Sequence, residues 1–133
     1  MISYSKVSLS ILNNVNSDSV VMEPFPHVVI REALPPELYA QLANEYPSIN
    51  TILSYGEVPK NNRRYQINAK RGLSTDILHK SWREFVQYHV SPEFWGEVVV
   101  KLGPAIRHVY PELEEQMGRG LGDFSLSVRG EVE

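Results

Sequence analysis

Cysteine is absent from this chain of 133 residues. Disulfides, thiolate metal sites and cysteine nucleophiles are therefore excluded. No apolar run approaches the ~18–20 residues that a membrane-spanning helix needs. The first residues also lack the basic stretch followed by an apolar stretch that marks a secretory signal. These absences predict a soluble protein of the cytoplasm without membrane contact.

An excess of basic charge is also missing. The sequence has 13 Lys and Arg against 16 Asp and Glu, a formal net charge of −3, which argues against general nucleic-acid binding. Hydrophobic residues make up 42% and charged residues 22%, as in ordinary globular proteins. A chain of this length can bury its own core. No linker or repeat divides it, so we predict a single domain over residues 1–133.

The common catalytic and nucleotide-binding patterns are missing too. The sequence has no Walker loop, no Gly-x-Gly-x-x-Gly after a strand, no His-Glu-x-x-His and no Gly-x-Ser-x-Gly. A facial iron site needs two imidazoles and one carboxylate, but none of the four histidines has Asp or Glu two positions later. We therefore predict no catalytic residue and no metal ligand in this chain. The acidic pair Glu114 and Glu115 is interpreted as a solvated face.

Apolar residues recur at helical spacing in three stretches, residues 36–46, 82–89 and 92–102. Pro36 suits the start of the first helix, and Pro47 ends it because the residue before a proline avoids helical geometry. Ser91 supplies a capping hydroxyl directly before Pro92, which is a strong signal for the start of the third helix.

Glycine, proline and hydroxyl residues suggest where the shorter helices lie. Gly103 and Pro104 are expected to stop the third helix. Residues 105–109 and 111–117 would then form separate short helices. Ser74 or Thr75 is expected to cap another short helix.

Three further segments, residues 27–31, 64–69 and 124–128, have the composition or alternation typical of strands. We therefore predict an α+β fold, with several helices packed on a small, mostly antiparallel sheet. The apolar helix faces should form the core. The side chains expected to be buried are Leu38, Leu42, Trp82, Phe85, Phe94 and Trp95.

The segment of residues 60–71 carries five positive charges and no acid. Three interpretations stay open. It is a solvated loop and edge strand whose charges discourage pairing, or an anion-recognition patch for a carboxylate or phosphate, or a single-stranded nucleic-acid site that uses aromatic stacking. The acidic net charge disfavours the last. The candidate binding side chains are Arg63, Arg64, Tyr65, Lys70 and Arg71.

Several motifs occur in an order that resembles one protein family. Residues 24–30 (PFPHVVI) precede residues 34–42 (LPPELYAQL), and three more motifs follow: residues 61–67 (NNRRYQI), 82–94 (WREFVQYHVSPEF) and 110–113 (YPEL). Together they resemble the N-terminal region of Fe(II)/2-oxoglutarate-dependent oxygenases of the prolyl-4-hydroxylase-like superfamily. The resemblance covers nearly the whole chain, from Tyr4 to Arg129.

The resemblance implies a structural N-terminal portion whose helices support a double-stranded β-helix. The parent enzyme would use Fe(II), 2-oxoglutarate and O2 to hydroxylate a substrate. Its catalytic strands would follow a segment like residues 128–131 (VRGE), where this sequence nearly ends. Because the iron-binding His-x-Asp and distal His are missing, this chain alone is expected to be inactive.

The alternative hypothesis is a non-catalytic interaction module that uses the basic segment 60–71 or an exposed aromatic face. If the barrel that the helices should cover is missing, apolar helix surface and the edge of the last strand are left without partners. Such surfaces favour association, so we predict a homo-oligomer, most simply a dimer. Its interface is expected to involve the strand of residues 124–128 or the helix of residues 92–102.

Overall fold

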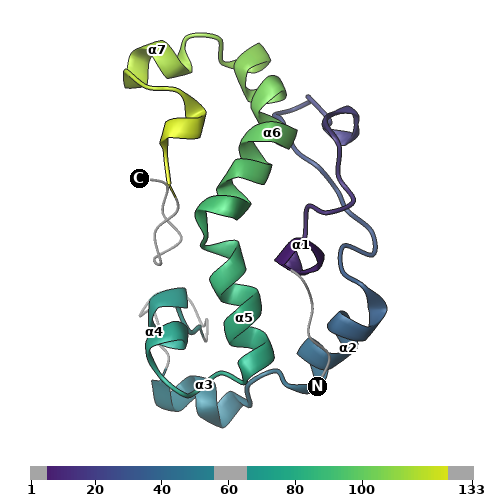
Figure 1. Cartoon of the computed structure of the whole chain (residues 1–133), viewed down its shortest axis with the longest axis vertical. Coiled ribbons are helices and arrows are strands. Elements are labelled where there is room, and N and C mark those ends of the chain that lie inside the picture. Colours follow the sequence, from purple (N-terminus) through teal and green to yellow (C-terminus); the bar gives the residue numbers. More distant parts are fainter. Residues whose placement is uncertain (1–5, 56–65, 126–133) are drawn as a thin grey trace.

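A computed structural model describes residues 6–55 and 66–125 of the chain. These residues form helices and short helical turns, joined by loops, and Figure 1 shows their arrangement. The elements in order are α1 (Lys6–Leu9), η1 (Ser17–Ser19), α2 (Pro36–Asn44), α3 (Ile49–Tyr55), α4 (Ala69–Ser74), α5 (Lys80–His89), α6 (Pro92–Val109), α7 (Leu113–Met117) and η2 (Leu121–Asp123).

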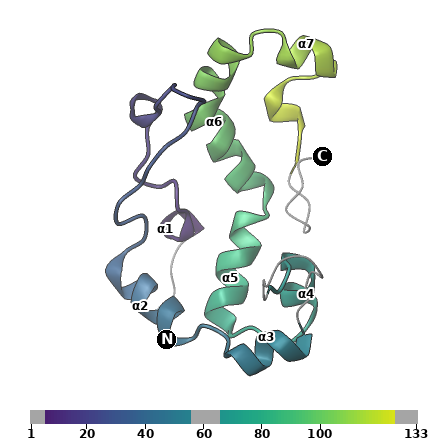
Figure 2. The same ribbon diagram turned by 180° about the vertical axis from the view of Figure 1, so that it is seen from behind.

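Helices α5 and α6 follow one another along the long axis of the molecule (Figure 1). Ser91 separates them, and its hydroxyl accepts a hydrogen bond from the N–H of Phe94 at 3.3 Å, which confirms the predicted helix start. Helices α1 and α2 lie on one side of this axis. Helices α3 and α4 lie at one end and α7 at the opposite end, as the reverse view in Figure 2 also shows.

The predicted α+β fold is wrong, because the described residues contain no sheet. Within residues 27–31, only His27 pairs with another extended residue, through an isolated antiparallel bridge to Val21. The neighbouring Pro24 and Pro26 have no N–H to extend this bridge into a ladder. Val29, which the strand hypothesis would bury, is 79% exposed.

The predicted strand over residues 64–69 is also wrong in its described part. Gln66 is a single bridge residue, Ile67 and Asn68 have no regular structure, and Ala69 already begins α4. The Asn68 side chain caps this helix by accepting a hydrogen bond from the N–H of Arg71 at 2.8 Å. The predicted caps were therefore misplaced, since Ser74 ends α4 and Thr75 follows it.

The predicted strand of residues 124–128 is not formed in its described part. Phe124 and Ser125 have no strand structure, and residues 126–128 lie outside the described part of the chain. The guanidinium carbon of Arg119 lies 3.9 Å from the centre of the Phe124 ring. A cation–π contact therefore accounts for the position of this aromatic side chain.

The prediction that Gly103 and Pro104 stop the third helix is wrong. Helix α6 runs through both residues as one element of 18 residues. A proline inside a helix removes the hydrogen bond to the carbonyl four residues earlier, here that of Val100. Pro104 is exposed and Val100 is 71% exposed, so this carbonyl lies on the solvent side, where water can bond to it.

The core lies where α1, α2, α5 and the start of α6 meet. Leu9, Leu38, Leu42 and Tyr88 are buried there, and the partly buried side chains that pack against them are Leu34, Trp82, Phe85 and Phe94. The predicted burial of Leu38 and Leu42 is thus confirmed, while Trp82, Phe85 and Phe94 are only half-buried. Trp95 is also half-buried, and its indole N–H donates to the carbonyl of Leu121 at 2.9 Å.

Candidate functional site

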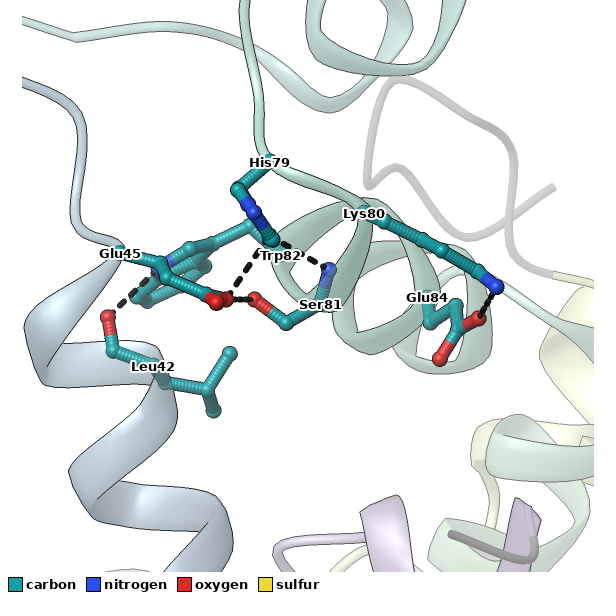
Figure 3. A network of polar contacts seen from close by, with 7 residues as sticks. All are labelled: Leu42, Glu45, His79, Lys80, Ser81, Trp82 and Glu84. Atoms are coloured by element: carbon teal, nitrogen blue, oxygen red, sulfur yellow. Dashed lines mark hydrogen bonds and ion pairs between the residues drawn. The ribbon is translucent and has the colours of Figure 1, made fainter. Parts of the chain in front are cut away.

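A polar junction joins the end of α2 to the start of α5 (Figure 3). His79 is the residue before α5, and its Nδ1 lies 2.8 Å from Oε2 of Glu45, the residue after α2. The hydroxyl of the buried Ser81 donates to the same carboxylate oxygen. The indole N–H of Trp82 donates to the carbonyl of Leu42 at 2.7 Å. Three contacts between five side-chain and backbone groups therefore hold the two helix ends together.

The geometry of the junction does not match a nucleophile and its base. A catalytic hydroxyl gives its proton to an imidazole, whereas Ser81 donates to the Glu45 carboxylate. The His79 Nδ1 also lies 3.5 Å from the N–H of Ser81. Nδ1 of His79 cannot donate a hydrogen bond to Glu45 and accept one from Ser81 at the same time. Because its contact with Glu45 is much shorter, we assign Nδ1 as the donor to Glu45. The junction is thus a structural connection between helices.

A groove adjoins this junction, and Trp82 belongs to both. We call it the α3–α4–α5 groove; its volume is about 300 Å3 and its lining is mostly apolar. The lining residues are Tyr46, Pro47, Ile52, Gln66, Ile67, Leu78, Trp82 and Val86. The Trp82 ring stands edge-on between the rings of Tyr46 and Phe85, at centroid distances of 5.5 and 5.7 Å. Because the indole N–H of Trp82 is bonded to the Leu42 carbonyl, this ring is held in one position without a ligand.

Apolar surface continues from the groove onto the outside of α3. Ile52 points its side chain into the buried side of this helix, while Ile49 and Leu53 are 54% and 47% exposed. Tyr46, at the rim of the groove, is 62% exposed. Exposed apolar patches beside a groove are typical of interaction sites.

The groove also lies in the basic part of an acidic chain. Residues 60–83 carry seven basic side chains and only one acid, Asp76, whereas the rest of the sequence carries six basic and fifteen acidic side chains. Four lining residues of the groove fall within this basic stretch. Arg83 is held by Asp76 at 3.0 Å. Lys80 pairs with Glu84 at 3.7 Å. The charge of this stretch is thus partly balanced within the chain, and a preference for a negatively charged partner is a prediction from the sequence.

The structure places only part of the predicted anion-binding set. Arg63, Arg64 and Tyr65 lie outside the described residues. Lys70 and Arg71 are exposed in the first turn of α4, three to five residues beyond the lining residues Gln66 and Ile67. Binding of an anion by these side chains stays a prediction.

The imidazole of His89 is engaged at both nitrogens. Nδ1 donates to the carbonyl of Phe85 at 2.7 Å, and Nε2 accepts from the N–H of Ile11 at 3.2 Å. These bonds define the neutral form. Burial among aromatic rings lowers the pKa of His89 below its ordinary value, despite the opposing effects of the Phe85 carbonyl and of Glu97.

The family resemblance implies an iron site in the parent enzyme but no iron ligand in this chain, and three of its histidines have partners within the chain. Nδ1 of His27 lies 2.7 Å from the carbonyl of Phe25, and those of His79 and His89 have the partners given above. Among residues 6–55 and 66–125, no group of three His, Cys, Asp or Glu side chains could hold a metal ion. The described residues therefore do not fit a facial iron site, and no chemical step through iron is derived.

Sequence reasoning missed both the junction and the groove. His79 precedes a helix, which is a local signal for a cap, but nothing in the sequence pairs it with Glu45.

No helix in the described ranges is long and apolar enough to cross a membrane. Comparisons with protein-family models, curated proteins and solved structures found no match.

Proposed function

We propose that this chain is a non-catalytic interaction module whose α3–α4–α5 groove docks a segment of a partner protein. The partner segment presents an apolar anchor side chain flanked by acidic residues. The observation that carries this proposal is an apolar groove with a fixed tryptophan wall, set in the basic stretch of an otherwise acidic chain.

The shape of the surface favours a protein segment over a small molecule. A small ligand is normally buried over most of its own surface. Here Tyr46 at the rim is mostly exposed, and the apolar surface of Ile49 and Leu53 extends past the groove. A helix or extended segment covers a groove and its rim together, with one side chain as the anchor.

Dye binding tests the groove directly. The probe is 8-anilinonaphthalene-1-sulfonate, which combines apolar rings with one negative charge. The chain has two tryptophans, so Trp95→Phe leaves Trp82 as the only energy donor to the dye. We expect dye emission on tryptophan excitation, reduced severalfold by Val86→Gln in the groove lining.

The matched control is Val100→Gln, the same change at a 71% exposed position of α6. It should leave the dye signal unchanged. Equal signals from the parent and from folded Val86→Gln protein would refute the groove as a binding site. A neutral dye, N-phenyl-1-naphthylamine, should bind more weakly if the basic stretch contributes.

The order of the sequence motifs supports a second candidate function. In this candidate the chain is the structural N-terminal portion of an Fe(II)/2-oxoglutarate-dependent oxygenase. In that case the helices would support a catalytic domain, and the exposed apolar surface would face it. A reading frame that continues past Glu133 into His-x-Asp and a distal His would favour this candidate. A stop codon there would favour the interaction module.

A further inference from the structure

The backbone that follows α1 is held against the central helices by two side chains. Residues 8–15, here called the N-terminal strap, contain four buried residues, which are Leu9, Ser10, Leu12 and Val15. From α5, Nε2 of His89 accepts a hydrogen bond from the N–H of Ile11 at 3.2 Å. From α6, Nζ of Lys101 donates to the carbonyl of Leu12. The position of the strap therefore depends on one imidazole and one ammonium group.

The contact between His89 and Ile11 requires an imidazole without a proton on Nε2. Because Ile11 offers an N–H, Nε2 has to accept, and the ring proton lies on Nδ1, which donates to the carbonyl of Phe85 at 2.7 Å. In the protonated ring both nitrogens are donors. The new N–H on Nε2 would face the N–H of Ile11, and two donors repel each other. A protonated His89 therefore cannot keep this contact.

The charged groups of α6 do not offset the cost of a positive charge on the imidazole. Glu93, Glu97 and Lys101 follow one another at four-residue spacing along this helix. Burial lowers the pKa of His89, and the carboxylate of Glu97 opposes this effect without cancelling it. That carboxylate already accepts from the Tyr88 hydroxyl at 2.5 Å and lies 3.8 Å from the Lys101 ammonium.

The remaining surroundings of the imidazole are uncharged. The rings of Phe85 and Phe94 have their centres 4.2 and 4.7 Å from that of His89. Burial and the neighbouring Glu97 raise the pKa of Tyr88 to about 12, so this side chain stays neutral. The strap itself has no ionisable side chain. The closed strap thus selects the neutral form of His89.

We propose that the N-terminal strap is an acid-released cover and that His89 is the switch that releases it. At neutral pH the strap is closed over the adjoining faces of α2 and α5. In mild acid a proton on Nε2 of His89 breaks the contact with Ile11, and the strap opens. The device is separate from the α3–α4–α5 groove, whose lining contains no residue of the strap.

Opening of the strap exposes part of the core. Leu9 belongs to one buried cluster with Leu38, Leu42 and Tyr88. These three side chains come from α2 and α5, and they reach solvent when Leu9 moves away. The chain continues from the strap into η1, which packs on α6. The opening is therefore local, and the central helices stay folded.

The direction of the pH dependence follows from the two states of the strap. In the open form His89 titrates like a free imidazole, at about pH 6.5, whereas burial lowers its pKa in the closed form. Between these two values the open form binds more protons, so a falling pH favours it. The ratio of open to closed molecules rises by at most about tenfold per pH unit in this window. The ammonium of Lys101 does not titrate in mild acid, so its contact adds no pH dependence there.

A single introduced thiol measures the opening, because the chain has no cysteine. Ser10 is 0% exposed, and Ser10→Cys is a small change at this buried position. The probe is 4,4′-dithiodipyridine, and each rate is divided by that of the same variant unfolded in urea at the same pH. We expect this ratio to rise by about threefold or more from about pH 7 to about pH 5.

Three second substitutions in the Ser10→Cys protein identify the cause of the rise. His89→Gln should remove the pH dependence, because glutamine keeps an acceptor oxygen but does not titrate. His108→Gln, the same change at an exposed position of α6, should leave the dependence intact. Lys101→Met should raise the ratio at both pH values and leave its pH dependence unchanged.

A fourth variant separates opening of the strap from unfolding of the whole chain. Ala105 is buried in α6, away from the strap, and the thiol of Ala105→Cys should stay protected in acid. Equal acid exposure of this thiol and of the thiol in Ser10→Cys would overturn the inference. A ratio that does not change with pH, or a change that persists in His89→Gln, would overturn it as well.

Nuclear magnetic resonance on the unaltered chain keeps the test decisive if His89→Gln does not fold. The imidazole protons of His89 and the backbone amide of Ile11 should titrate with the same midpoint. Two different midpoints, or an Ile11 amide whose shift does not change with pH, would refute the switch.

Discussion

The Nε2 atom of His89 accepts a hydrogen bond from the backbone N–H of Ile11, a residue 78 positions earlier in the chain, at 3.2 Å. The ammonium group of Lys101 donates to the carbonyl of Leu12 beside it. Two side chains, one from α5 and one from α6, therefore bind the backbone directly after α1. This attachment holds the N-terminal segment against the central helices and depends on a neutral imidazole.

The His89 contact makes stability depend on pH in a defined direction. The unfolded chain takes up a proton at His89 below about pH 6.5, whereas burial lowers the pKa of this imidazole in the folded chain. Between these two pKa values the unfolded state binds more protons, so stability is lost as the pH falls. The melting temperature should decrease from pH 7 towards acid more steeply than in His89→Gln. Parallel curves for the two proteins would contradict this account.

The junction between α2 and α5 should contribute measurably to stability. An intramolecular hydrogen bond contributes about 0.5–1.5 kcal/mol net, so His79→Ala and Glu45→Ala should each lower the free energy of unfolding by roughly this amount. Lys80→Ala is the control, because its contact with Glu84, drawn in the same view (Figure 3), is 3.7 Å long and exposed. Urea denaturation measures the difference. Equal effects of His79→Ala and Lys80→Ala would show that the junction adds nothing.

Pro104 offers a stabilising substitution. In Pro104→Ala the new N–H can bond to the carbonyl of Val100, and alanine favours a helix interior by up to about 3 kcal/mol over proline. Because the site is exposed, the methyl group meets no core side chain. We expect a higher melting temperature, with Gly96→Ala, at a helix position where an added Cβ meets nothing within 4 Å, as a comparison that gains about 1 kcal/mol. An unchanged or lower melting temperature in Pro104→Ala would mean that α6 requires the proline.

Both candidate functions predict that this chain alone binds no iron. Anaerobic titration with Fe(II) and 2-oxoglutarate should produce no metal-to-ligand charge-transfer band, because His27, His79 and His89 bond to groups within the chain. A stoichiometric band that disappears in His27→Ala or His89→Ala would contradict this expectation.

Features that depend on near neighbours could be read from the sequence. The starts of α2 and α6 were predicted because Pro36 and Ser91 act within four residues of the helix start. The burial of Leu38 and Leu42 followed from their spacing on one helix face. The basic character of residues 60–71 was also visible, although its predicted side chains at positions 63–65 are outside the described residues.

Features that depend on distant partners could not be predicted in this way. An apolar run such as residues 27–31 becomes a strand only if another segment pairs with it, and here His27 alone forms a bridge. Gly103 and Pro104 would end an isolated helix, but η1 and η2 both pack on α6, and the proline faces solvent.

The sequence by itself therefore determined the starts of α2 and α6, part of the core and the unequal distribution of charge. The tertiary structure alone decided that Glu45 meets His79, that Ile11 meets His89, and that an apolar groove forms between α3, α4 and α5. The physical reason is distance along the chain. A cap or a helix face is specified within a few residues, whereas these contacts exist only after separate helices have packed together.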